Sequence, residues 1–167
     1  MQKIRLDMKF TRDARRLMIS KLFRRPLKLM QDRMYEIMTG YEGEDPTRYM
    51  IYSGHDTTVI NVVEFLHPEN IEANYADFAT NVVMELHYDE ECVAGPTASE
   101  DCFTVQTLWN GVRMGFQECV TRLDSEGIDC TMSQFKDHMR NVWYDGAFAD
   151  DFEQACNQPT KPYGLSH

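Results

Sequence analysis

The sequence predicts an α/β fold, with a small mixed sheet and flanking helices. Three observations support it: an apolar stripe at helical spacing, a strand–turn–helix pattern, and two further strand-like segments. The 167 residues, 43% of them hydrophobic, are enough for one domain with a real core. No stretch approaches the roughly 20 apolar residues of a membrane span, and the first ten residues lack the apolar region of a signal peptide.

The first predicted helix covers residues 23–38. Five apolar side chains recur there at steps of three and four residues, which places them on one helix face: Phe23, Leu27, Met30, Met34 and Ile37. Pro26 suits the first turn of a helix, where its missing N–H costs nothing, and Gly40 is a typical helix end. Residues 1–20 are basic and weakly patterned, and a turn is predicted at 43–46.

A strand followed by a helix is predicted next. Residues 48–53 form a largely apolar run without polar alternation, which is typical of a strand buried on both faces of a sheet. Gly54 allows a sharp turn, Asp56 is a good N-cap for a helix over 57–66, and Pro68 is a good helix stop. Such a central strand needs neighbours on both sides, and the sequence offers few other strands.

Two more strands, at 81–88 and 103–109, are predicted to form a hairpin. In the second strand, alternate side chains fall on one side and are mostly apolar. The dipeptide Asn110-Gly111 marks a tight turn after it. A short helix is predicted over 133–143, and the chain shows no internal repeat or linker.

The five cysteines favour disulfides over a metal site. None forms a C-x-x-C pair, so a zinc ribbon is not expected. The couples Cys92/Cys102 and Cys119/Cys130 lie close together in loop-like sequence, which is typical of disulfides formed in an oxidising compartment. Cys156 is then left over, which indicates a free thiol, an intermolecular bond or a missing partner; we expect a free thiol. Five reduced cysteines are the alternative.

Charge is distributed unevenly along the chain. Residues 1–40 hold eleven Lys and Arg against four Asp and Glu, whereas residues 41–167 hold six against twenty-three. The acidic part argues against a nucleic-acid partner, because a phosphate backbone requires a basic face. The basic residues are interleaved with apolar ones at helical spacing, which favours a solvated helix surface over a nucleic-acid patch or a contact with the acidic part.

Candidate site residues lie where the predicted strand gives way to the helix. A helix N-terminus presents free N–H groups and partial positive charge, which favour an anion. His55 adds a hydrogen-bond donor, and Asp56 adds a carboxyl group that can transfer a proton. This combination suits phosphoryl chemistry. On the dipeptide alone, a capping aspartate beside a turn histidine is the simpler interpretation.

The longer motif carries a family resemblance. The stretch Ser53-Gly54-His55-Asp56-Thr57-Thr58-Val59 resembles the S-x-H-D-T-T pattern of the histidine acid phosphatases, in the phosphoglycerate-mutase-like superfamily. Similarity to the prostatic and lysosomal acid phosphatase group covers about residues 20–156. It includes the helix upstream of the motif, the apolar-Glu-Leu signature at Met84-Glu85-Leu86 with its hairpin partner, and the local cysteine pair Cys119/Cys130. Cys156 resembles a late cysteine that pairs far upstream.

The resemblance implies a fold, a reaction and a site. It implies part of a three-layer phosphatase domain that hydrolyses phosphate monoesters through a phosphohistidine, without a metal or another cofactor. His55 would bind the substrate phosphate and Asp56 would protonate the leaving oxygen, a step that typically contributes about 10²–10⁴-fold. The implied location is the secretory pathway, lysosomal or extracellular, and the implied partners are a phosphate monoester or phosphate and, in a homodimer, a second copy.

The sequence departs from the family at the nucleophile. The family carries a nucleophilic histidine in an R-H-G-x-R-x-P motif near its N-terminus, and the first histidine of this chain is His55. The pairs Arg15-Arg16 and Arg24-Arg25 do not match that motif. We therefore expect residues 1–167 to be the C-terminal portion of a single domain, with 1–20 and 158–167 peripheral and the nucleophile encoded upstream. By itself the chain is expected to be inactive, because no phosphohistidine can form.

The sequence disfavours two other enzyme classes and leaves one alternative function open. A metal-dependent H-D phosphohydrolase requires a histidine ligand before the H-D pair, and none precedes His55. A cysteine nucleophile requires a thiol poised near a base, whereas these cysteines lie in loop-like or terminal sequence. The serious alternative is a non-catalytic module that keeps part of the fold to bind phosphate or protein.

Overall fold

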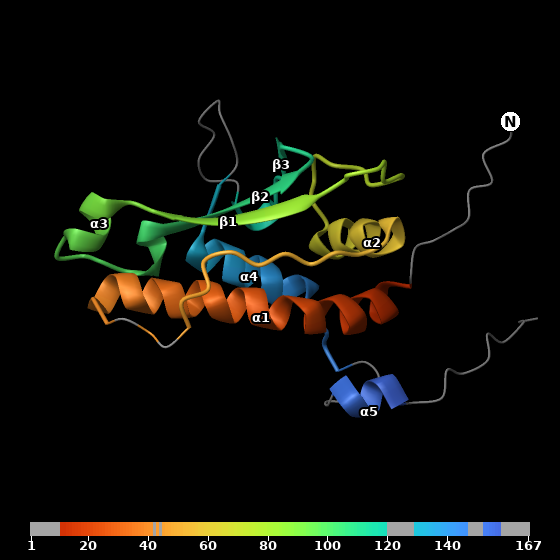
Figure 1. Ribbon diagram of the computed structural model, residues 1–167, viewed down its shortest axis with the longest axis horizontal. Helices are drawn as coiled ribbons and strands as arrows, with labels where there is room; N and C mark the ends of the chain where they lie inside the picture. The colour runs from red at the N-terminus through yellow and green to blue at the C-terminus, as the bar shows by residue number, and fades with distance from the viewer. Residues whose placement is uncertain (1–10, 42, 44, 120–128, 147–151, 158–167) are drawn as a thin grey trace, which may run out of the picture.

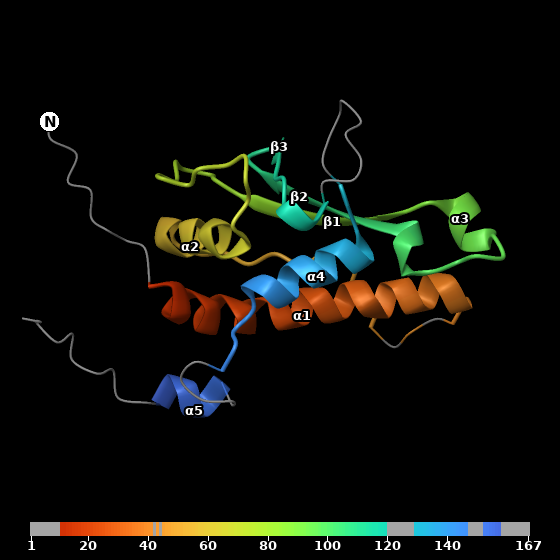
Figure 2. The same ribbon diagram turned by 180° about the vertical axis from the view of Figure 1, so that it is seen from behind.

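The computed structural model of the chain describes residues 11–41, 43, 45–119, 129–146 and 152–157; the tail predicted at 158–167 lies outside them. The described elements are α1 (Arg12–Thr39), α2 (Asp56–Leu66), β1 (Val82–Tyr88), α3 (Glu90–Ala94), the 3₁₀ turn η1 (Glu100–Cys102), β2 (Phe103–Trp109), β3 (Val112–Arg113), the 3₁₀ turn η2 (Gln117–Cys119), β4 (Cys130–Thr131), α4 (Met132–Val142) and α5 (Phe152–Asn157). Both views place α1, α2 and α4 on the same side of the sheet (Figure 1, Figure 2).

Helix α1 is longer than the helix predicted over 23–38. It begins after Thr11, whose side-chain oxygen accepts a hydrogen bond from an amide of the first turn, and it continues through Pro26. The prediction that Pro26 lies in the first turn is therefore wrong. Gly40 ends the helix with φ 68°, as predicted. The expectation that residues 1–20 are peripheral does not hold for the described residues 11–20, because several side chains there are buried: Leu17, Ile19 and Ser20.

The central strand predicted over 48–53 is not a strand in the structure. Tyr49, Ile51 and Tyr52 are 78%, 71% and 52% exposed, and none of the backbone–backbone hydrogen bonds found in the described residues involves this segment. A strand satisfies its backbone groups by pairing with a neighbour, and the described part of the chain places none beside residues 48–53. The segment therefore passes from α1 to α2 as extended, exposed chain (Figure 1).

The predicted hairpin over 81–88 and 103–109 is confirmed. β1 and β2 pair antiparallel in a register that runs from Val82 opposite Trp109 to Tyr88 opposite Phe103. β3 and β4 both pair with β2, again antiparallel. The expectation of a mixed sheet is therefore wrong for the described strands, since the segment that could have supplied a parallel neighbour does not pair.

One face of the sheet carries the core. Phe103, Val105 and Thr107 of β2 point to the helices and are 0%, 1% and 2% exposed, while the intervening side chains are partly exposed. They pack with buried side chains of α1, α2 and α4, among them Phe23, Val63, Leu66 and Phe135. The structure is thus a small antiparallel sheet covered by helices on one face. The full three-layer architecture remains a prediction.

Helix α4 confirms the helix predicted over 133–143. Thr131 and Gln134 form a capping box in which the Gln134 amide donates to Thr131 Oγ1 and the Thr131 amide donates to Gln134 Oε1 at 3.0 Å. The buried face of the helix then packs into the core through Met132, Phe135, His138 and Met139. The box ties the start of α4 directly to β4.

The turn between β2 and β3 gives a first testable prediction. Asn110 and Gly111 have φ values of 49° and 80°, which match the tight hairpin turn that the sequence predicts. Gly111→Ala is expected to lower the free energy of unfolding by about 1–2 kcal/mol, because a Cβ is unfavourable in the left-handed region. Urea denaturation checks this value. Gly111→Asn is the control, since asparagine tolerates this conformation better; equal losses for both variants would contradict the explanation.

Candidate functional site

The candidate site lies where the extended segment ends and α2 begins. Gly54 precedes the helix and approaches it closely: a Cβ built there would lie 3.2 Å from the Thr58 Cβ and 3.3 Å from its Cγ2. A larger residue would force Thr58 to shift. The glycine of the Ser53–Val59 motif is therefore explained by space at the first turn of α2.

His55 and Asp56 lie next to each other at this turn, and both are exposed. His55 is the N-cap, with φ −77° and ψ 162°, and its side chain makes no capping hydrogen bond. The prediction that Asp56 is the N-cap is wrong by one residue. Its carboxylate nevertheless accepts a hydrogen bond from the Thr57 amide at 2.7 Å, which satisfies one of the amides that the helix leaves unpaired.

The arrangement has the properties that an anion site requires. The first turn of α2 combines unpaired amides with the positive end of the helix dipole. The His55 imidazole can add a donor or a positive charge, and Asp56 places a proton-transfer group directly after it. The structure therefore brings both predicted site residues to one accessible point.

Helix α2 is held in place by a residue that local sequence does not single out. The Arg15 guanidinium of α1 donates to Asn61 Oδ1 at 3.4 Å and to the Glu64 carbonyl at 3.3 Å, and lies 3.6 Å from the Glu64 carboxylate. Asn61 is fully buried and donates to the Thr57 carbonyl at 2.8 Å. These contacts span more than forty residues of chain, so no motif or periodicity could have indicated them.

A depression of about 400 Å³ lies away from this site. It is formed by the second half of α1 and the residues after it, and is lined by Arg25, Lys28, Leu29, Asp32, Tyr35, Glu36, Tyr41, Gly43 and Asp45. Its charged side chains are all in ion pairs: Arg25 lies 3.1 Å from Asp45, Lys28 pairs with Asp32, and Glu36 pairs with Arg33 and Arg48 outside the lining. The depression therefore offers no unpaired charge comparable to the start of α2.

The remaining described histidines lie at the surface or in the core, away from His55. His67 is exposed and ends α2 with φ 50°. His87 is exposed and lies 3.1 Å from Glu85. His138 is 3% exposed and is hydrogen-bonded inside the core. In the described part of the chain, no group of three or more His, Cys, Asp or Glu side chains is arranged to hold a metal ion.

Both predicted disulfides are present. Cys92 is bonded to Cys102 and Cys119 to Cys130, with Cα–Cα distances of 5.5 and 4.8 Å. The bonds indicate an oxidising environment. Cys156 belongs to α5, but its side chain lies outside the described residues, so the predicted free thiol stays a prediction.

None of the described helices has the length and apolar content needed to cross a membrane. The candidate site at His55 and Asp56 is inferred from the arrangement of these two residues in this chain. Searches against protein-family models, curated proteins and solved structures find no match to this chain.

Proposed function

We propose that this chain supplies one part of an acid-phosphatase-like site, the part that binds the phosphate and protonates the leaving group. One observation carries the proposal: His55 and Asp56 are adjacent, exposed and located at the first turn of α2. The motif around them supports it, since the whole stretch from Ser53 to Val59 resembles the histidine acid phosphatase pattern. The implied substrate class is the phosphate monoesters.

The two side chains have complementary roles in this reaction. The phosphate of the monoester sits at the α2 N-terminus, where amides and the His55 imidazole donate to its oxygens. As the ester P–O bond breaks, its electron pair stays on the leaving oxygen and takes the proton from the Asp56 carboxyl group. The phosphoryl group passes to the nucleophile, from which water later removes it.

The nucleophile has to come from a segment that this sequence does not contain. No R-H-G-x-R-x-P motif occurs in the 167 residues, and no histidine precedes His55. The mostly exposed residues 48–53, whose backbone pairs with no described strand, support this view, because an apolar extended segment with free backbone groups is suited to accept a further strand. A strand added there would end beside His55 and Asp56.

Reconstitution tests the proposal. The chain alone is expected to show no turnover of an aryl phosphate at about pH 5, where carboxyl groups begin to be protonated. Addition of a polypeptide with a strand followed by R-H-G-x-R-x-P is expected to produce turnover that Asp56→Asn removes. Asp89→Asn is the matched control, since Asp89 is also an exposed aspartate at a helix start.

Two outcomes would count against the proposal. Turnover by the chain alone that depends on Asp56 would mean that the nucleophile lies within these 167 residues. A reconstituted pair that binds tightly but hydrolyses nothing would contradict the assigned reaction.

The second candidate function is a non-catalytic phosphate-binding module. The missing nucleophile favours it, because the exposed start of α2 needs no partner to bind an anion. Titration of the chain with inorganic phosphate distinguishes it: the amide signals of residues 56–58 would shift in the NMR spectrum, and His55→Ala would weaken the response. Binding without any reconstituted turnover would favour the module.

A further inference from the structure

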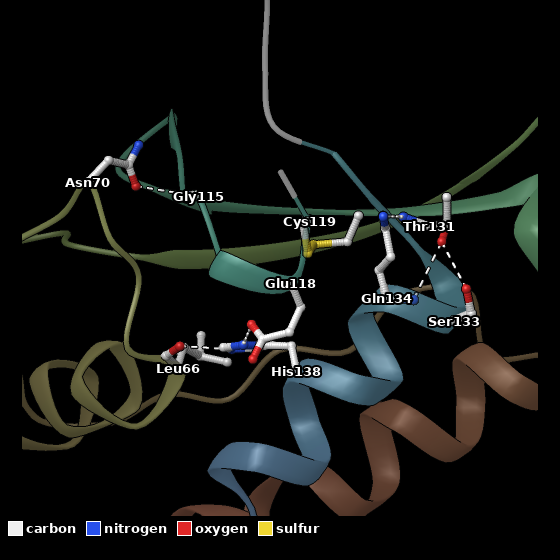
Figure 3. Close-up of a disulfide and its surroundings, with 10 residues drawn as sticks. Leu66, Asn70, Gly115, Glu118, Cys119, Thr131, Ser133, Gln134 and His138 are labelled. Carbon is white, nitrogen blue, oxygen red and sulfur yellow. Dashed lines mark hydrogen bonds and ion pairs between the residues drawn. A yellow bond between two sulfur atoms is a disulfide. The ribbon is translucent and has the colours of Figure 1, made fainter. Parts of the chain in front are cut away.

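His138 has an unusual environment for a core histidine. It is 3% exposed, and both ring nitrogens have a partner: Nδ1 lies 2.8 Å from Glu118 Oε2, and Nε2 lies 2.8 Å from the Leu66 carbonyl oxygen. The Phe116 ring stacks on the imidazole with centroids 4.2 Å apart. Figure 3 shows the imidazole on α4 between the carboxylate of Glu118 and the end of α2, with the Cys119 disulfide beyond Glu118.

The number of hydrogen-bond donors in this group determines how many protons the His138 ring must hold. A carbonyl oxygen and a carboxylate only accept hydrogen bonds, and a neutral imidazole has a single N–H. Both contacts are therefore hydrogen bonds only if His138 holds two protons or if Glu118 holds one. Burial by itself raises the pKa of the Glu118 carboxyl, but hydrogen bonds from Asn141 and His138 outweigh burial and hold that pKa below its usual range. Glu118 is therefore the ionised partner.

Three neighbours of the ring favour a positive charge. Leu66 is the last residue of α2, and the carbonyl end of a helix carries partial negative charge. The Glu118 carboxylate adds a full negative charge at 2.8 Å. The face of the Phe116 ring attracts a cation through its quadrupole.

We propose that His138 connects three elements of the core in a proton-dependent way. With both ring nitrogens protonated, it hydrogen-bonds α4 to the end of α2 and to η2. Loss of one proton breaks one of these two hydrogen bonds. This device is independent of the proposed function. It acts on the opposite end of α2 from His55, and it reinforces the disulfide that connects η2 with β4.

The other ionisable groups on the packed elements are paired elsewhere or exposed. Within the described residues near the end of α2, Glu64 pairs with Arg15, and His67 is exposed to solvent. On α4, Lys136 pairs with Glu100 and Arg140 with Asp137, while Ser133 donates to Asp101 of η1. Asp56 lies exposed at the far end of α2. Glu118 is thus the carboxylate that faces the His138 ring.

The sign of the pH dependence follows from proton binding. An unfolded histidine releases its proton near pH 6.5, whereas the folded chain requires the second proton for its His138 contacts. Because the folded state binds more protons above that pH, stability falls as pH rises. Above about pH 6.5 the unfolding equilibrium constant is expected to rise with pH, at most about tenfold per pH unit for a single proton.

Urea denaturation at a series of pH values tests whether the His138 hydrogen bonds depend on the second proton. Glu118→Gln is the decisive variant, because its side-chain amide can donate to Nδ1 of a neutral ring while Nε2–H still donates to Leu66. The variant is expected to lose this rise of the unfolding constant with pH. Glu85→Gln is the matched control, since it alters the exposed contact with His87 and is expected to keep the wild-type slope.

A measurement on the unmodified chain tests the protonation of His138 without any substitution. Nitrogen-15 NMR of the imidazole is expected to show both His138 nitrogens protonated at about pH 7, above the point where an unfolded histidine is half protonated. A spectrum with a single protonated nitrogen at that pH would overturn the proposal. So would a Glu118→Gln variant whose pH slope equals that of the wild type.

Discussion

Phe103→Ala is expected to lower the free energy of unfolding by about 3–5 kcal/mol, the usual loss for a fully buried phenylalanine. The side chain is 0% exposed at the start of β2, and its ring centroid lies 5.9 Å from that of Tyr88 on the paired strand. Removal of the ring leaves a cavity between the sheet and the helices that a small core refills only in part. The effect should be large because Phe103 belongs to the main core cluster.

The chain offers a matched control for this change. Phe78 lies in the loop before β1 and is 102% exposed, so Phe78→Ala removes the same atoms without opening a cavity. Its effect is expected to stay within about 0.5 kcal/mol, as for most surface substitutions. Urea denaturation of both variants, monitored by circular dichroism, gives the two values. Equal losses would show that the burial described for β2 is wrong.

Removal of the Cys119–Cys130 disulfide, as Cys119→Ala with Cys130→Ala, is expected to cost about 2–4 kcal/mol. Both cysteines are 1% exposed, and the bond connects η2 with β4 just before the capping box of α4. Loss of the crosslink frees the unfolded chain and also removes buried sulfur atoms from the core. Denaturation of the double variant, compared with the wild type under oxidising conditions, measures the loss.

The second disulfide separates these two contributions. The Cys92–Cys102 bond closes a loop of nearly the same size, with a sequence separation of 10 against 11, so chain entropy alone predicts equal losses. Cys92 is only partly buried, whereas both partners of the other bond lie in the core. Removal of Cys92–Cys102 is therefore expected to cost less. A larger cost for this bond would contradict the role assigned to core packing.

Local signals were enough to predict much of the fold. Helix α2 follows from apolar spacing between a helix-start residue and Pro68, and the β1–β2 hairpin follows from the alternation of apolar side chains. The tight turn between β2 and β3 follows from Asn110-Gly111. The two disulfides follow from cysteine couples close together in sequence. His55 and Asp56 were found in the same way, because a strand-like segment, a glycine and a helix start are consecutive in the chain.

Contacts between distant residues decided the features that sequence missed. Helix α1 extends toward its N-terminus with the help of buried Ser20, whose hydroxyl accepts a hydrogen bond from the Tyr144 amide at 2.9 Å across 124 residues. The Arg15 contacts that position α2 and the paired acceptors around His138 are equally non-local. Periodicity describes one element at a time, so it holds no information on such partners.

The sequence by itself determined the helices α2 and α4, the hairpin, the cysteine pairing and the candidate pair His55 and Asp56. Only the tertiary structure decided that residues 48–53 stay unpaired and exposed and that the sheet is antiparallel. The physical reason is that a helix satisfies its hydrogen bonds within one segment, whereas a strand depends on a neighbour that another part of a chain must supply.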